Sequence, residues 1–94
     1  MLNSKQKQHL RSLGNTLKAT VQVGKEGVKE SVVLSLDQSL EAHELVKVSV
    51  LKSYTSAVME CALDLSRLTH CEIVQVIGRS ILLYRTSNKH LISL

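Results

Sequence analysis

The stretch VGKEGVKE, residues 23–30, contains the residue types that could bind an anion. Gly24 and Gly27 bracket Lys25 and Glu26, directly after a short apolar run and directly before a long amphipathic segment. Glycine lets a second backbone approach closely, and the first N–H groups of a helix have no partner within that helix and carry partial positive charge. A strand–GxxG–helix junction therefore predicts either a tight turn between the two elements or a site for a phosphate group.

Basic residues around this loop favour the phosphate site. The segment before Glu26 carries five basic residues and no acid: Lys5, Lys7, Arg11, Lys18 and Lys25. Lys7 and Arg11 are one helical turn apart, and Lys29 follows the loop. A second basic group, with no acid after Glu72, comprises Arg79, Arg85 and Lys89. Glu26 argues against the site, because a carboxylate beside a phosphate is unfavourable unless it points outward.

The aromatic content restricts how such a loop could bind nucleic acid. The chain has no Phe or Trp, and its only aromatic residues are Tyr54 and Tyr84. RRM sheets and most single-strand binders stack bases on aromatic rings, whereas a KH domain clamps the nucleotide backbone with a GXXG loop. Contacts from backbone amides and cations, which read phosphate and shape more than base sequence, are therefore expected. Neither GxxxxGK[ST] nor GxGxxG is present.

The elements that position the loop follow from periodicity. Residues 5–13 predict a helix that Ser4 caps, with Leu10 and Leu13 facing inward. Gly14-Asn15 predicts its end, since both residues tolerate the left-handed conformation found past helix ends. The remaining predicted elements are a strand at Thr20–Val23, a helix from Val28 to His43, a strand at 45–51, a helix at Ser56–Leu68, and two strands at Glu72–Ile77 and Ser80–Tyr84.

These elements predict a single compact α/β (α+β) domain over residues 1–94, with a core at about 2–86 and a loose tail at 87–94. The order α-β-α-β-α-β-β implies parallel neighbouring strands joined by helical crossovers. Gly78-Arg79 predicts a final hairpin, which makes the four-stranded sheet mixed. In the third helix Cys61, Leu65 and Leu68 are expected to face inward.

Three stretches together resemble a known family: VQVGKEGV, LDQSLEAHELVKV and EIVQVIGRSILLYR. They are similar to the YhbY-like CRM domain (chloroplast RNA splicing and ribosome maturation) over about residues 2 to 86. The resemblance implies a fold like the C-terminal domain of translation initiation factor 3, RNA binding, and association with precursors of the large ribosomal subunit. It also implies that loop 24–27 contacts RNA. The chain departs from the family pattern at Thr16 and Ala19, where prolines are frequent, and at Lys29, where threonine is usual.

Other kinds of chemistry find little support in the sequence. Cys61, His70 and Cys71 match no common zinc spacing, so neither a metal nor another cofactor is expected. Two cysteines are too few for a disulfide framework and are expected to be small buried thiols. Asp64 and Ser66 lie on the helix before His70 at offsets that do not converge as a catalytic triad, so no enzyme and no small-molecule substrate are expected.

Two functions remain as expectations. The first is a non-enzymatic RNA-binding module, cytoplasmic because neither a membrane span nor a signal peptide is evident. Its site comprises Gly24, Lys25, Glu26, Gly27, Lys29, Lys7, Arg11, Lys18 and Arg79, with Arg85 joining if the last strand lies beside the first. The second is an adaptor that binds a ribosomal or assembly protein through the acidic second helix, at Asp37, Glu41 and Glu44.

Overall fold

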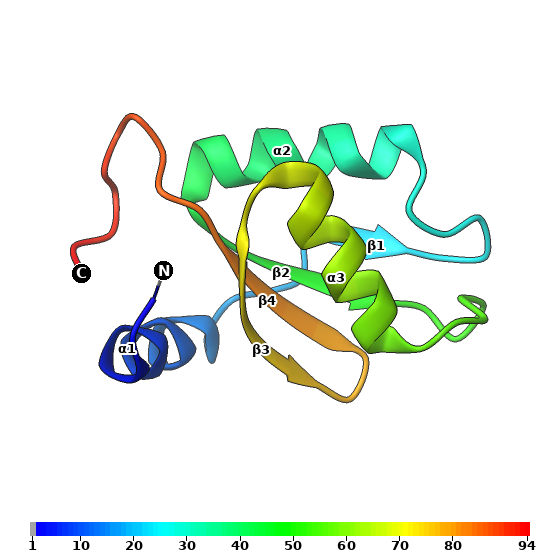
Figure 1. Cartoon of the computed structure of the whole chain (residues 1–94), viewed down its shortest axis with the longest axis horizontal. Coiled ribbons are helices and arrows are strands. Elements are labelled where there is room, and N and C mark those ends of the chain that lie inside the picture. Colours follow the sequence, from blue (N-terminus) through cyan, green and yellow to red (C-terminus); the bar gives the residue numbers. More distant parts are fainter. Residues whose placement is uncertain (1) are drawn as a thin grey trace.

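Helices and strands follow one another in the predicted order in the computed structural model, which describes residues 2–94 (Figure 1). Their bounds are α1 Ser4–Gly14, β1 Val21–Val23, α2 Glu30–His43, β2 Leu45–Val50, α3 Val58–Thr69, β3 Glu72–Ile77 and β4 Ser80–Tyr84. In this part of the chain no helix is both long enough and apolar enough to cross a membrane.

The four strands form a mixed sheet in the order β1-β2-β4-β3. β1 and β2 are parallel and joined by α2, as predicted, and β3 and β4 form the predicted hairpin. The expectation that successive strands are parallel neighbours is wrong for β2 and β3. The hairpin folds back so that β4 inserts between them and pairs antiparallel with both.

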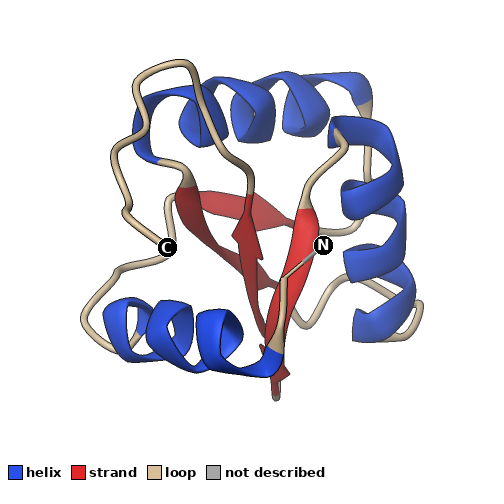
Figure 2. Ribbon diagram, turned by 60° about the vertical axis from the view of Figure 1, so that its left-hand side comes forward, coloured by secondary structure: helices blue, strands red, loops and turns tan. Residues whose placement is uncertain are grey.

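The sheet lies between two helical layers, with α2 and α3 on one face and α1 on the other (Figure 2). The larger core lies under α2 and α3, where fully buried Leu36, Leu40 and Leu65 meet the valines of β1 and β2. Each such leucine contributes about 2 kcal/mol by leaving water. A smaller cluster under α1 contains Leu10, Leu45, Val74, Leu82 and Tyr84.

Helix α1 begins one residue earlier than expected and packs through a narrow contact line. Asn3, not Ser4, is the N-cap, and its Oδ1 accepts the N–H of Gln6 at 2.8 Å while Gln6 Oε1 accepts the Asn3 N–H at 3.0 Å. The helix stops at Gly14-Asn15 as predicted, although Asn15 keeps a right-handed φ of −60°. A Cβ on Gly14 would lie 2.6 Å from Leu82 Cδ2, so any larger residue at this position would force the Leu82 side chain to move.

The other helices differ from prediction at their ends. α2 begins at Glu30 rather than Val28, because Gly27 has φ 74° and Lys29 remains extended. α3 runs from Val58 rather than Ser56, and it ends where His70 adopts a left-handed φ of 56°.

Leu13 and Leu68, both predicted to face inward, are instead 39% and 42% exposed. The contact line of α1 runs through Leu10 and Gly14, which are buried and leave Leu13 at its edge. In α3 it is Thr69 that turns inward beyond Leu65, and its hydroxyl donates to the Leu65 carbonyl at 2.7 Å. In the last turn of both helices the buried residue is therefore one position later than predicted, Gly14 in place of Leu13 and Thr69 in place of Leu68.

The C-terminal tail is not loose, because Glu44 holds it against the domain. Glu44 is the C-cap of α2, has φ 66° and is fully buried, so its predicted place on an acidic surface is wrong. Its Oε2 accepts the N–H and the hydroxyl of Ser87, each at 2.8 Å, and Oε1 accepts the Ile92 N–H at 2.8 Å. Burial alone raises the pKa of Glu44, but these hydrogen bonds outweigh it and lower the pKa to about 2.

Candidate nucleic-acid interface

The GKEG loop is a closed turn that joins β1 directly to α2. Pairing with β2 fixes its start, where the Leu51 N–H donates to the Val23 carbonyl at 2.8 Å. The Gly27 N–H then donates to the Gly24 carbonyl at 2.9 Å, and the Lys29 N–H donates to the Gly27 carbonyl at 3.1 Å. The loop therefore ends at the first turn of α2.

The first turn of α2 presents unpaired backbone donors beside this loop. Lys29 is the N-cap and makes no side-chain capping bond. Its carbonyl accepts the N–H groups of Val32 and Val33 at 3.0 and 3.1 Å, whereas within residues 2–94 no acceptor bonds to the N–H of Glu30 or Ser31. Such donors at the positive end of a helix dipole form an anion site.

The charges on the loop are arranged so that one cation stays available. Lys29 Nζ lies 3.0 Å from Glu26 Oε1 and 3.3 Å from Oε2, so these two exposed side chains compensate each other. Lys25 is exposed and makes no ion pair or hydrogen bond within the described residues. The carboxylate that argued against a phosphate is thus already paired, in an exposed contact worth at most about 1 kcal/mol.

Glycine suits the two loop positions, 24 and 27, for different structural reasons. Gly27 takes φ 74°, a left-handed conformation that other residues adopt only with strain. Gly24 has no such φ, and a Cβ there would make ordinary contacts at 3.4 Å with Leu51 Cδ1 and Ser53 Oγ. Gly24 and Leu51 both line an open groove of about 560 Å³ that also includes Gln22 and the rest of the loop. Glycine at 27 avoids backbone strain, while at 24 the absence of a side chain leaves room beside Leu51 in this groove.

A second loop, residues 51–54, flanks the GKEG loop, and the sequence did not indicate this position beside the site. Arg79 holds it in place, donating from Nε to the Val50 carbonyl at 2.9 Å and from Nη2 to the Leu51 and Tyr54 carbonyls at 2.7 and 3.4 Å. The Tyr54 ring lies 3.7 Å from the position of a Cβ on Gly27. Burial, followed by the negative charges around it, raises the pKa of Tyr54. No sequence pattern links Tyr54 to Gly27, because the contact depends on the pairing of β1 with β2.

Most of this chain matches a known family. Residues 2–85 match the CRS1 / YhbY (CRM) domain. The chain belongs to this family. Its relatives include the "Probable RNA-binding protein YqeI" of Bacillus subtilis, 39% identical over 90 residues that cover 96% of this chain and 94% of the relative. An "RNA-binding protein" of Haemophilus influenzae is 34% identical over 93 residues, which cover 99% of this chain and 94% of the relative.

A solved structure shares the fold of this CRM domain. The solution structure of the hypothetical protein SAV1595 from Staphylococcus aureus superposes with a TM-score of 0.78 at 44% sequence identity. The match covers 90% of this chain and 88% of the other. The predicted family and the predicted fold class, a mixed four-stranded sheet with three helices, are both confirmed.

The other predicted basic residues of the CRM domain do not gather at the loop. Lys7 and Arg11 lie on α1, which Figure 1 shows at the end of the long axis away from the GKEG loop, and Lys18 lies in the connection from α1 to β1. Arg85 was expected to join the site only if the last strand lay beside the first. It does not, because β2 separates β4 from β1. The structure therefore places Lys25 and Lys29 together on or beside the loop, with Arg79 holding the flanking loop 51–54. It leaves Lys7, Arg11, Lys18 and Arg85 elsewhere.

Arg85 instead joins α2 to α3. Its guanidinium is 2.7 Å from Asp37 Oδ1, 3.2 Å from Glu41 Oε2 and 2.7 Å from the Thr69 carbonyl, and its side chain is only 18% exposed. Because Asp37 and Glu41 are paired and Glu44 is buried, the acidic helix offers less charge to a partner than its sequence indicates.

The cysteines of the CRM domain are buried, unpaired thiols, as predicted. Burial, followed by the charge of Asp64, raises the pKa of Cys61 to about 11, so this thiol stays protonated at neutral pH. Within residues 2–94 no three His, Cys, Asp or Glu side chains are grouped so that they could hold a metal ion.

Proposed function

We propose that this CRM domain binds RNA without catalysing a reaction, seating backbone phosphate on loop 24–27 and the first turn of α2. Two observations carry the proposal: among the described residues the N–H groups of Glu30 and Ser31 have no partner, and the exposed Lys25 on the adjoining loop makes no ion pair. The names of the relatives from Bacillus subtilis and Haemophilus influenzae support RNA as the ligand. Phosphate contacts of this kind position an RNA without reading its sequence.

The basic residues then divide by role. Lys25 contacts phosphate, and Lys29 joins it when it leaves Glu26. Lys7, Arg11 and Lys18 attract more distant parts of a longer RNA, since they lie away from the loop. Arg79 and Arg85 act by holding protein carbonyls and carboxylates, which supports positioning roles rather than phosphate contacts.

The salt dependence of binding tests the proposal directly. For about four phosphate contacts, the affinity for single-stranded RNA falls with a log–log slope of about −3 against salt concentration. Fluorescence anisotropy titrations at several salt concentrations measure this slope. An affinity that does not respond to salt contradicts phosphate binding.

The cellular role that we propose is in ribosome assembly in the cytoplasm, on the RNA of large-subunit precursors. Sucrose-gradient sedimentation of the tagged protein, with and without nuclease treatment, tests this role. Co-sedimentation with precursors that nuclease abolishes supports it. Association that survives nuclease and is lost on reversing the charge of Glu41 supports the adaptor function instead.

Glu26→Gln is expected to tighten RNA binding about threefold. The change releases Lys29 from an exposed ion pair and removes a negative charge beside the phosphate. Anisotropy should also show a slightly steeper salt slope. Glu60→Gln, an identical charge change at an exposed position on α3, is the control and should have little effect. Equal effects of the two variants would mean that only net charge matters.

Alanine substitutions at the two loop glycines are expected to have different effects, one on stability and the other on RNA binding. Gly27→Ala should lower the free energy of unfolding by about 1 kcal/mol, because alanine at φ 74° is strained. Gly24→Ala should change stability by less than about 0.5 kcal/mol yet weaken RNA binding severalfold, because the methyl group narrows the groove. Urea denaturation and anisotropy measure the two quantities. Wild-type affinity in Gly24→Ala would show that RNA does not approach this backbone.

A further inference from the structure

Helix α1 leaves half of its face of the sheet open. Strand register places Gln22, Ser49 and Ser80 in one row across β1, β2 and β4, with Ile77 of β3 completing it. The next row contains Lys47, Leu82 and Gln75. The side chains of the first row are exposed or half-buried, and Ile77 is 62% exposed. An antiparallel sheet can leave one face to water, but this face is also hollowed.

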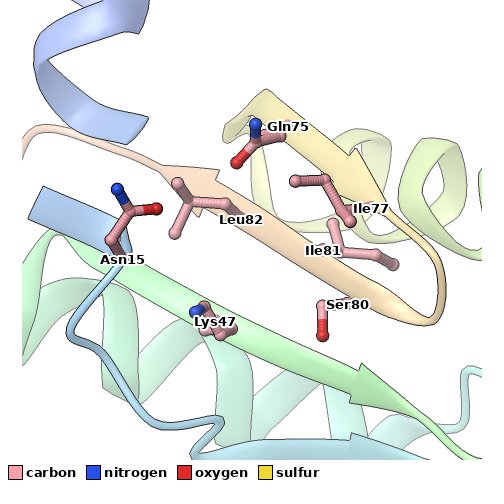
Figure 3. Close-up of a pocket in the computed structure, with 8 residues that line it drawn as sticks. Asn15, Lys47, Gln75, Ile77, Ser80, Ile81 and Leu82 are labelled. Carbon is pink, nitrogen blue, oxygen red and sulfur yellow. The ribbon is translucent and has the colours of Figure 1, made fainter. Parts of the chain in front are cut away.

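The hollow is a pocket of about 170 Å³ between the end of α1 and strands β2, β4 and β3. Figure 3 shows the side-chain amides of Asn15 and Gln75 on either side of Leu82. Ser80 lies on the same strand as Leu82, Lys47 lies on the neighbouring β2, and Ile77 lies on β3 at the rim. The pocket thus combines an apolar floor with two amides, a hydroxyl and an ammonium group. Each amide can both donate and accept a hydrogen bond.

The charge around this pocket fits an anionic ligand. Lys47 lines it, and Arg11 lies one helical turn before Asn15, on the same flank of α1. Glu72 is the one acidic residue whose register places it on this face, and it accepts the Leu2 N–H at the far end of β3. The other acidic residues lie on the GKEG loop, on α2 and its C-cap, or on α3.

One row of residues across the sheet leads from the groove at the GKEG loop to the pocket. Gln22 lines that groove and also begins the row that leads through Ser49 to Ser80 at the pocket. Two strand spacings, about 10 Å, separate Gln22 from Ser80. An RNA strand with a phosphate on the loop can therefore place a nearby nucleotide over the pocket.

We propose that this pocket receives an unpaired nucleobase of the RNA strand that the loop holds, so that the domain has a base preference as well as phosphate affinity. An unpaired base has apolar faces, which suit Leu82 and Ile77, and hydrogen-bonding edges, which suit the amides of Asn15 and Gln75. Lys47 neutralises an adjoining phosphate. This proposal rests on the proposed function, because the loop must first hold the strand.

The test compares oligoadenylate, oligouridylate and oligocytidylate of equal length by anisotropy. The wild type should prefer one of them by about tenfold, and the double variant Asn15→Ala/Gln75→Ala should lose most of that preference with an unchanged salt slope. Lys25→Asp should weaken binding of all three probes alike and keep the ratio. Gln38→Ala, which removes an exposed amide from α2, is the control. Urea midpoints check folding, and Gln75→Ala alone replaces the double variant if that unfolds.

The outcomes separate the two proposals. Equal affinity of the wild type for the three probes, or a preference that the pocket variants leave unchanged, overturns the pocket and leaves phosphate binding standing. Loss of preference in the pocket variants, with Lys25→Asp binding like the wild type, would show that the pocket selects a base and would overturn the loop as the site that holds the strand. A wild type that binds none of the probes overturns both proposals.

Discussion

Replacing Lys25 by aspartate is expected to weaken RNA binding at least about tenfold, which corresponds to about 1.4 kcal/mol. Lys25 is exposed and unpaired within the described residues, and it stands beside the open N–H groups of Glu30 and Ser31. The substitution removes an attractive charge and places a repulsive one where the phosphate would lie. Losing one phosphate contact should also make the log–log salt slope shallower by about 0.7.

The measurement for Lys25→Asp is anisotropy with a structured fragment of large-subunit ribosomal RNA at several salt concentrations. Lys5→Asp is the matched control, because it makes the same charge change at an exposed position in the first turn of α1, away from the loop. Circular dichroism verifies that both variants keep their helical content. Equal losses in the two variants would assign the effect to net charge, and an unchanged affinity in Lys25→Asp would leave the loop as a turn only.

Local patterns predicted the elements well because their causes are local. The alternation in TVQV, the helical period after Val28 and the glycine pair at 24 and 27 each depend on neighbouring residues. Errors at the helix ends arose where one backbone angle decides the boundary, as at Gly27 and His70. The position of β4 beside β2 depends on packing of the whole sheet, which no short pattern expresses.

The partners of charged side chains could not be predicted in the same way. Arg79 bonds to the Tyr54 carbonyl 25 residues away, and Arg85 bonds to Asp37 48 residues away. The sequence shows each as a basic residue, and only the fold shows that its charge is already engaged. For the same reason the site that we propose, the GKEG loop and the start of α2, is narrower than the ten predicted residues dispersed over the chain.

Replacing Glu44 by glutamine is expected to lower the free energy of unfolding by about 2 kcal/mol, through loss of charge-assisted hydrogen bonds to a buried carboxylate. The amide would present an NH₂ group to the donors of Ser87 and Ile92. Glu41→Gln, one turn earlier on α2 and exposed, is the control and should cost less than about 1 kcal/mol. Urea denaturation at neutral pH measures both, and equal losses would contradict the role of Glu44 in fixing the tail.

The stability difference between the wild type and Glu44→Gln should also depend on pH in a defined direction. The pKa of Glu44 is lowered in the folded protein from 4.5 to about 2, so the folded state favours the ionised carboxylate. Its contribution is complete above pH 4.5 and disappears as the pH falls from 4.5 toward 2. Urea midpoints of both proteins between pH 7 and pH 3 should therefore converge on acidification. Subtracting the variant from the wild type removes the contributions of the other carboxylates, which the two proteins share. A difference that stays constant over this range would mean that Glu44 stabilises the tail through the number of hydrogen bonds it accepts and not through its charge.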